Sequence, residues 1–536
     1  MPRRSNSALL AAVFVIAFAR LAIGVEDTGI ASGYVDPVGK IAAQDEAVYS
    51  HSAIQMAEHG NWLTPVFLDR FALYKPPLLY WASALSMKML GVNPFSIRLP
   101  SLLAGALLLT LVFWWALQSW GLLAACGSAM LLGSSHLFHT MARLNLTDAL
   151  LTLCFAGAAA CLYRDPDLAS RRAFFGFAMF TAAAILTKGV AGVMPLLMIA
   201  VDWALRKRSL SQARTLLQLG LCTAALAAPW FLYQLLVHHR WFWAEFVLVE
   251  NIAFGTGSPP QTSEETQIWF YIRRMFLIDP ALTLAALAAI PIWWKRRSPE
   301  AALLVAWIAA VAIALLGYQY RNASYLLPMV VAFSIVAAPV ARSRVFTLAL
   351  LPVVLLLNLY AGEGPWGLPF QTGSTLASAP PLKQYCERSR GNELIIVSPD
   401  DEFYSSVLPL PRVRYCYLVP EPPERLYALD FQHLGIVLTA SQFETLNTLR
   451  PTFARRLSEW GLPSDRSMGT VILARSPKEI SALIAAHPSD DFLVPTAMVD
   501  AAATASHNVV PASATRAFLL ARNAIPSQAH QWSCGL

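Results

Sequence analysis

The stretch LPSLLAGALLLTLVFWWAL, residues 99–117, contains no charged side chain. A helix of about 20 apolar residues crosses the hydrocarbon core of a bilayer, so this stretch predicts a transmembrane helix. Ten further apolar runs follow the same pattern, at residues 8–25, 121–139, 144–163, 173–187, 189–205, 214–237, 276–294, 300–317, 323–340 and 345–361. We therefore expect an α-helical polytopic membrane protein with about 11 transmembrane helices.

The composition of the 536 residues favours the same class of fold. Hydrophobic residues make up 56% of the chain and charged residues only 14%, which is more apolar surface than one soluble core can bury. The formal net charge is +7, but the basic residues separate apolar runs instead of gathering on one soluble face. The pattern predicts a membrane protein and no nucleic-acid partner.

Basic residues between the apolar runs predict the orientation in the membrane. The clusters are Arg3 and Arg4; Arg164, Arg171 and Arg172; residues 206–208; residues 295–297; and Arg342 and Arg344. All of them fall in the cytoplasm if the N-terminus is cytoplasmic, as the positive-inside rule requires. A cleaved signal peptide at residues 8–25 is the alternative, although Arg20 interrupts the run and no A-x-A site follows it. We expect a multi-pass inner-membrane protein with an extracytoplasmic C-terminal domain.

The domain organisation follows from this topology. Residues 1–362 form the expected transmembrane domain, whose long outer loop, residues 26–97, carries an interfacial helix at 46–59. Beyond residue 380 the pattern changes to that of a small soluble α/β domain, residues 380–480. Its expected strands are Leu394–Val397, Val413–Leu418, Gly435–Leu438 and Thr470–Leu473. Residues 481–536, rich in Ala and Ser, are expected to form a loosely ordered tail.

The seven cysteines show no metal-ligand spacing such as C-x-x-C. Four of them lie inside apolar runs and are expected to be packing residues: Cys126, Cys154, Cys161 and Cys222. Cys386 and Cys416 fall in the soluble part, where a disulfide between them and two free thiols are both open interpretations.

Ionisable residues at the ends of the predicted spans gather on the outer side. They are Asp45, Glu46, Lys75, Arg98, Arg143, Asp148, Lys188, Glu250 and Arg321. A charge held deep in the bilayer costs roughly 2.5 to 3.5 kcal/mol, and outer basic residues run against the positive-inside rule. An anionic lipid headgroup such as a phosphate would compensate them, and the carboxylates leave room for acid/base chemistry.

Three segments carry the strongest signals. The Asp45-Glu46 pair starts the interfacial helix, where a carboxylate can act as a base, as a metal ligand or as an ordinary helix cap. Two prolines follow Lys75 and fix the backbone before it, which suits a preorganised phosphate ligand as well as a lysine that reaches to the interface. Lys188 precedes Gly189 in a short turn with the same two interpretations.

Two arginines and one further carboxylate complete the candidate set. Arg143 and Asp148 flank the start of one span and are expected to face one cavity, with a capping role as the alternative. Arg321 lies at the mouth of a span, where its guanidinium could bind two phosphate oxygens.

Taken together, the motifs of the outer side resemble the aminoarabinose-transferase and protein-mannosyltransferase-like family of GT-C integral membrane glycosyltransferases. The motifs are Asp45-Glu46, Lys75-Pro76-Pro77-Leu78 with Tyr80-Trp81, Ala142-Arg143 with Thr147-Asp148, Leu186-Thr187-Lys188-Gly189 and Tyr325-Leu326-Leu327-Pro328. The resemblance covers roughly residues 40–340 and rests on the order of the motifs, each of which is weak alone. It implies a GT-C-like fold and a polyprenyl-phosphate sugar donor.

The resemblance also implies roles for individual residues. Asp45 becomes the leading candidate for the catalytic base, with Glu46 and Asp148 as further catalytic carboxylates. The candidate substrate-binding residues are Lys75, Tyr49, Tyr80, Arg143, Lys188 and Arg321. The chain departs from the family pattern at three places: Val48 stands before Tyr49 where an arginine is frequent, Tyr74 stands before Lys75 where an acidic residue is common, and Glu250-Asn251 stands where a histidine is expected.

The expected activity is inverting transfer of a sugar from a polyprenyl-phosphate donor to an acceptor hydroxyl on the extracytoplasmic face. The acceptor could be a lipid, a polysaccharide or a protein. No cofactor is required by the sequence, and a divalent cation at Asp45 and Glu46 is an open alternative. A lipid or anion transporter and a non-catalytic envelope assembly protein are the rival functions, although a transporter is expected to carry more polar groups near the membrane midplane.

Overall fold

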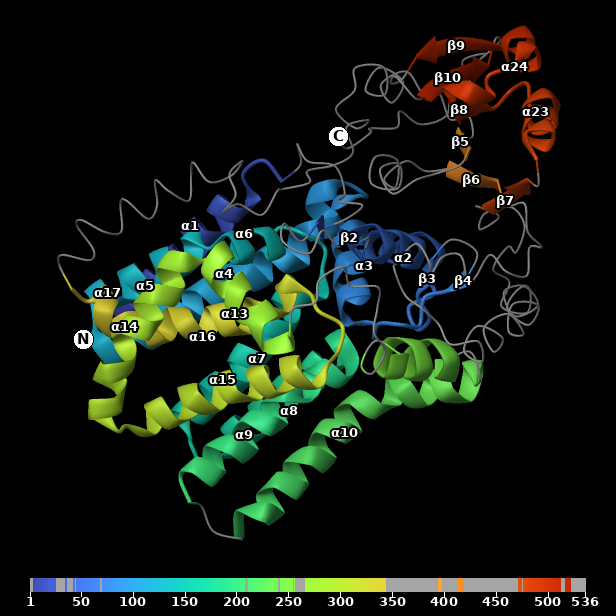
Figure 1. Cartoon of the computed structure of the whole chain (residues 1–536). Coiled ribbons are helices and arrows are strands. Elements are labelled where there is room, and N and C mark those ends of the chain that lie inside the picture. The colour runs from blue at the N-terminus through green and yellow to red at the C-terminus, as the bar shows by residue number, and fades with distance from the viewer. Residues whose placement is uncertain are drawn as a thin grey trace.

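The computed structural model describes most of the helical part of the chain and a smaller portion of the C-terminal part (Figure 1). The described residues are 3–25, 34–35, 42–43, 45–67, 70–207, 211–239, 242–253, 255, 266–343, 394–397, 413–418, 471–474, 476–511 and 516–521. The expected span at 345–361, the expected strand Gly435–Leu438 and Cys386 lie outside them.

Helices dominate the first 343 residues and form one bundle (Figure 1). In chain order they are α1 (Arg3–Ala22), α2 (Asp45–His59), α3 (Leu78–Leu90), α4 (Pro94–Trp120), α5 (Leu122–Ser134), α6 (His136–Met141), α7 (Thr147–Arg164), α8 (Arg171–Lys188), η1 (Gly189–Val193), α9 (Met194–Leu205), α10 (Ser211–His238), η2 (Trp243–Ala253), α13 (Gln267–Ile278), α14 (Pro280–Arg296), α15 (Pro299–Gly317), η3 (Ala323–Leu326), α16 (Leu327–Val336) and α17 (Ala338–Ala341). Two short hairpins, β1 (Tyr34–Val35) with β2 (Ala42–Ala43) and β3 (Val66–Phe67) with β4 (Arg70–Phe71), flank α2 in the sequence.

The helices coincide with the apolar runs of the sequence, as expected of a mostly helical membrane fold. Among the described residues, four stretches are long and apolar enough to cross a bilayer: Pro94–Trp120, Arg171–Leu205, Gln212–His238 and Pro299–Gly317. The pair α13 and α14, bent by 108°, would add a fifth if it forms a single span. Several of the remaining apolar helices are shorter than a full span, and the count of about 11 stays a prediction.

Two glycines allow the close turn between α8 and α9. Gly189 has a φ of 56°, in the left-handed region that favours glycine. A Cβ atom on Gly192 would lie 2.2 Å from the backbone nitrogen of Ile185, so η1 packs directly on the backbone of α8. This turn fixes the end of α8 and thereby the position of Lys188.

Basic residues mark the end of the bundle opposite α2. Arg164 ends α7 and stacks over Trp114 at 4.8 Å, and Arg296 ends α14 and stacks over Trp120 at 4.4 Å. Arg206 donates to the carbonyl of Pro299 at 2.7 Å. Helices α4 and α7 run from the α2 end to this basic end. Large aromatic side chains such as Trp115 and Trp307 pack in the core of the bundle.

The C-terminal part contains a mixed six-stranded sheet in the order β7-β6-β5-β8-β10-β9. Its strands are β5 (Leu394–Val397), β6 (Val413–Leu418), β7 (Val471–Ala474), β8 (Asp491–Pro495), β9 (His507–Pro511) and β10 (Arg516–Ala521), with helices α23 (Pro477–Ala486) and α24 (Ala501–Ser506). Strands β5–β7 and β8 pair in parallel, whereas β10 pairs antiparallel with β8 and β9.

The loosely ordered tail expected at residues 481–536 differs from what the structure shows. Strands β8, β9 and β10 lie in this segment and extend the sheet of β5. The segment is rich in Ala and Ser overall but contains short apolar runs. In one of them, the side chains of Phe492, Leu493 and Val494 are buried against the sheet. Three of the four expected strands coincide with β5, β6 and β7, the last shifted by one residue.

Candidate functional site

A buried ion pair holds α2 against the rest of the bundle. Glu46 accepts two hydrogen bonds from Arg98, at 2.8 and 3.0 Å, and a third from the backbone N–H of Asn145 at 2.8 Å. Arg98 also donates to the carbonyl of Val25 at 3.0 Å. Both side chains are at most 2% exposed, and a buried pair is stable only when its hydrogen bonds are made in this way.

This geometry changes the expected role of Glu46. Its carboxylate oxygens are engaged by Arg98 and Asn145, which lie in α4 and in the turn before α7. We therefore assign Glu46 the role of positioning α2, in place of the expected role in catalysis. Sequence reasoning named Arg98 only as one of the outer charges, because a contact over 52 residues leaves no local signal.

Asp45 is the first residue of α2 and is half-buried. The N-terminus of a helix stabilises a carboxylate, so Asp45 suits its position as a structural residue as well as a reactive one. Burial, and after it the charge of Asp45, raises the pKa of Tyr49, and the same charge opposes the lowering of the Lys75 pKa that burial causes. Among the described residues, no ion pair occupies its carboxylate.

Lys75 lies between β4 and α3, in the segment that the two prolines hold rigid. It is buried and pairs with Glu250 of η2. The pKa of Lys75 is lowered from 10.5 to about 8: burial is the largest cause and Lys188 acts in the same direction, whereas Asp45 and Asp148 oppose the shift. These interactions place the ammonium group of Lys75 close to the charges of Asp45, Asp148 and Lys188.

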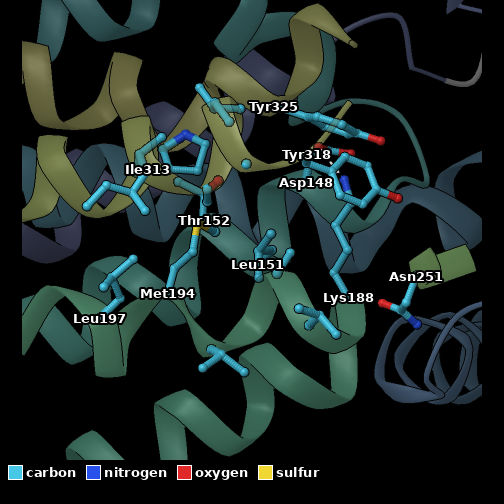
Figure 2. Close-up of a pocket in the computed structure, with 18 of the residues that line it drawn as sticks. Asp148, Leu151, Thr152, Lys188, Met194, Leu197, Asn251, Ile313, Tyr318 and Tyr325 are labelled. Carbon is cyan, nitrogen blue, oxygen red and sulfur yellow. Dashed lines mark hydrogen bonds and ion pairs between the residues drawn. The ribbon is translucent and has the colours of Figure 1, made fainter. Parts of the chain in front are cut away.

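A second ion pair joins α7 to α8. The Nζ atom of Lys188 donates to Asp148 at 2.8 Å and lies 4.4 Å from the centre of the Tyr325 ring (Figure 2). Asp148 is in the first turn of α7 and Lys188 is the last residue of α8. The partial charge of each helix end is opposite in sign to the side chain there and stabilises it. The structure thus brings four of the candidate residues together: Asp45, Lys75, Asp148 and Lys188.

Two of these four residues, Asp148 and Lys188, line a cavity of about 360 Å³, whereas Asp45 and Lys75 are not part of its wall (Figure 2). One part of its wall is polar and contains Asp148, Lys188, Glu250, Asn251, Tyr318 and Tyr325. The other part is apolar and contains Leu151, Met194, Leu197, Val311, Ile313 and Leu315 of α7, α9 and α15. A cavity with a charged end and an aliphatic wall fits an amphiphile better than a fully polar solute.

Tyrosines surround the charged end. Tyr49 and Tyr80 are buried and meet edge to face at a centroid distance of 5.8 Å. Tyr318 donates to the backbone carbonyl of Glu250 at 2.9 Å, and its ring lies 6.3 Å from that of Tyr325. The sequence analysis names Tyr49 and Tyr80 as candidates and gives Tyr325 only as part of a motif, whereas Tyr318 is found from the structure alone. Both Tyr318 and Tyr325 lie close to Arg321 in the sequence and near the ends of expected spans, and this position is the signal that could have identified them.

Two candidate residues lie elsewhere. Arg321 stacks over Phe270 of α13 at 5.3 Å and is not part of the cavity wall. Arg143 faces Arg98 and Arg20 and not the cavity, contrary to the expectation that it shares one with Asp148. Within the part of the chain that the structure describes, no group of three His, Cys, Asp or Glu side chains could hold a metal ion.

Comparison with known proteins gives three kinds of match. The family model described as dolichyl-phosphate-mannose-protein mannosyltransferase matches residues 74–241. The undecaprenyl phosphate-alpha-4-amino-4-deoxy-L-arabinose arabinosyl transferase of Aeromonas hydrophila is 28% identical over 294 residues, which is 53% of each chain. The protein of the same name from Shewanella sediminis is 27% identical and covers 62% of this chain and 59% of its own.

The chain therefore spans about half the length of the curated relatives it matches. Over almost the full length it has the fold of a solved structure, that of ArnT from Cupriavidus metallidurans bound to undecaprenyl phosphate. The TM-score is 0.65 at 16% identity, with 97% of this chain and 98% of the other covered. At this level of identity the likeness concerns the fold.

Proposed function

We propose that the chain is a member of the aminoarabinose-transferase and protein-mannosyltransferase-like family of GT-C membrane proteins, and that it is a glycosyltransferase with a polyprenyl-phosphate-linked sugar as donor. The acceptor is a hydroxyl group on the extracytoplasmic side. In this proposal the N-terminus is cytoplasmic and the α2 end of the bundle faces outward, in agreement with the basic residues at the opposite end.

One observation carries the proposal: Asp148 and Lys188 line the polar end of a cavity whose other wall is aliphatic, and Lys75, which pairs with the lining residue Glu250, interacts electrostatically with Asp45, Asp148 and Lys188. The two ammonium groups would bind the donor phosphate, and the apolar wall would contact the first isoprene units. Lys75 and Lys188 each have a carboxylate partner that a phosphate can replace without leaving the lysine unpaired.

The reaction requires a base at the attacking hydroxyl. Glu46 is held by Arg98 and Asp148 by Lys188, whereas Asp45 has no ion pair among the described residues. Asp45 would remove the proton of the acceptor hydroxyl while its oxygen forms the bond to the anomeric carbon. The bond from that carbon to the phosphate oxygen breaks, and the polyprenyl phosphate leaves with its added negative charge next to Lys75 and Lys188.

The charges of the site set a condition on donor binding. Three carboxylates, Asp45, Asp148 and Glu250, face two ammonium groups, so the site carries one net negative charge before the phosphate enters. A proton on one carboxylate or a divalent cation would offset the added charge, and a dependence of binding on such a cation is part of the proposal.

Purified full-length protein tests the donor class directly. Mass spectrometry of the lipids that remain bound after purification from the native membrane should detect a polyprenyl phosphate or its sugar conjugate. Incubation with an undecaprenyl-phosphate-linked sugar and an envelope extract should then release undecaprenyl phosphate. Ordinary phospholipids as the sole bound lipids, together with no release of undecaprenyl phosphate, would refute the proposal.

A further inference from the structure

A second cationic group lies at the α2 end of the bundle, outside the cavity. It consists of Arg20 near the end of α1, His139 of α6 and Arg143 in the turn before α7, and we call it the arginine patch. We propose that the arginine patch binds the phosphate of an anionic phospholipid from the surrounding bilayer.

The first step is the geometry that orders Arg20. One of its terminal nitrogens, Nη1, lies 2.7 Å from Nε2 of His139, so the guanidinium donates and the imidazole accepts. Burial lowers the pKa of His139, and Arg20, Arg143 and His136 lower it further, which keeps the ring neutral as this hydrogen bond requires. The histidine thus orients the arginine without neutralising its charge.

The second step is the missing counter-charge. Arg143 is half-buried, and besides burial the groups that lower its pKa are Arg98 and Arg20, both positive. Glu46, the neighbouring carboxylate, is engaged by Arg98. In the described part of the chain neither Arg20 nor Arg143 forms an ion pair with a carboxylate. Two guanidinium groups that repel each other favour an anion between them, and a phosphate accepts hydrogen bonds from both.

The third step identifies the anion as part of a lipid. Arg20 lies on the exposed face of α1 between Ile16 and Ile23, which are 68% and 69% exposed and follow the spacing of one helical face. Such large apolar side chains at the surface of a membrane protein contact acyl chains. A phospholipid would place its chains along Ile16 and Ile23 and its phosphate at Arg20, whereas a soluble anion would use only the charges.

Titration of phosphatidylglycerol onto the full-length protein tests the site. The protein would be held in phosphatidylcholine nanodiscs, and bound phosphatidylglycerol counted by native mass spectrometry. Arg20→Gln and Arg143→Gln should each weaken retention about fivefold, the effect expected of one basic residue at an anionic lipid surface. Arg171→Gln is the matched control, because Arg171 is an exposed arginine at the opposite end of the bundle. This control substitution should leave the retention of phosphatidylglycerol unchanged.

Two outcomes would overturn the inference. The first is equal retention of phosphatidylglycerol by the wild-type protein and both variants. The second is displacement of the lipid by excess inorganic phosphate, since that would indicate a site for a free anion. Undecaprenyl phosphate binding in the same spectra reports on the cavity of Lys75 and Lys188 and should be unaffected. Failure of the lipid site is therefore distinguishable from failure of the proposed function.

Discussion

The two cationic groups at the α2 end of the bundle differ in how their charges are balanced. The first group consists of two lysines, Lys188 in the cavity wall and Lys75 beside it, and both have carboxylate partners within the protein. The arginine patch uses guanidinium groups, and its hydrogen bond goes to a neutral histidine. Both groups lie near the ends of helices, yet one is balanced internally and the other is not.

This difference indicates two kinds of anion binding. A lysine that exchanges a carboxylate for a phosphate can bind and release a lipid in each reaction cycle, because the lysine is paired in both states and a proton or a divalent cation can balance the displaced carboxylate. Two arginines without carboxylates favour a ligand that stays bound. The cavity is therefore suited to a substrate and the arginine patch to a resident lipid. Four predictions test this comparison, beginning with the largest effect.

Asp45→Asn should reduce sugar transfer by about 10²- to 10⁴-fold, the usual contribution of a positioned general base. The substitution keeps the size of the side chain and its place at the start of α2, so binding of undecaprenyl phosphate should persist. Release of undecaprenyl phosphate from the sugar-linked donor is the measurement. Asp167→Asn, an exposed carboxylate between α7 and α8, is the control, and equal activity of the two variants would exclude Asp45 as the base.

Arg98→Met should lower the stability of the protein by about 3 to 5 kcal/mol, because it leaves Glu46 buried without its partner. The apparent melting temperature in detergent measures the effect. The double variant Arg98→Met with Glu46→Gln should recover part of the loss, since it removes the stranded charge. An unchanged melting temperature of the single variant would contradict the positioning role of Glu46.

Lys188→Met should weaken binding of undecaprenyl phosphate about 10- to 100-fold, the effect of losing one charge-assisted hydrogen bond and leaving Asp148 unpaired. Lys88→Met serves as the control, because Lys88 stacks over Trp62 at 5.5 Å and takes no part in the cavity wall. Similar losses in both variants would show that the cavity does not select the phosphate.

Binding of undecaprenyl phosphate should fall as the pH rises through about 8. Burial disfavours the charged form of Lys75 and lowers its pKa from 10.5 to about 8, so its ammonium group is present below this pH and lost above it. The affinity is expected to decrease by up to about tenfold per pH unit above the transition. Lys75→Arg should keep its affinity over the same range, and a parallel decrease in both proteins would assign the titration to another group.

Much of this architecture was readable from the sequence. Uncharged runs such as residues 99–117 mark helices because lipid excludes charge, and residues at their ends therefore gather in layers. Reasoning of this kind was enough to group Asp45, Lys75, Asp148 and Lys188, which the structure brings together. It also located three strands of the C-terminal sheet.

The remaining features depend on contacts between distant segments. The pairing of Glu46 with Arg98 and of Lys75 with Glu250 requires knowledge of which helices are neighbours, and residue spacing does not encode this. Arg143 interacts with Arg98 and Arg20 instead of lining the cavity, which also depends on the packing of α1 and α4 against the turn before α7. Strand β8 is longer than β5 and β7, which were located from the sequence, but it lies in the Ala- and Ser-rich segment 481–536, whose composition obscures its apolar pattern.

The three hydrogen bonds of Glu46 have a consequence for how this protein can vary among its relatives. They join α2 to α4 and to the turn that begins α7, and the residues next to these contacts include Asp45 and Asp148. A shift of α2, which carries Asp45, would therefore break these hydrogen bonds or move the turn before α7 with it. In natural variants, a replacement of Glu46 should therefore be accompanied by a replacement of Arg98. The residues of the arginine patch should instead vary with the lipid composition of each host.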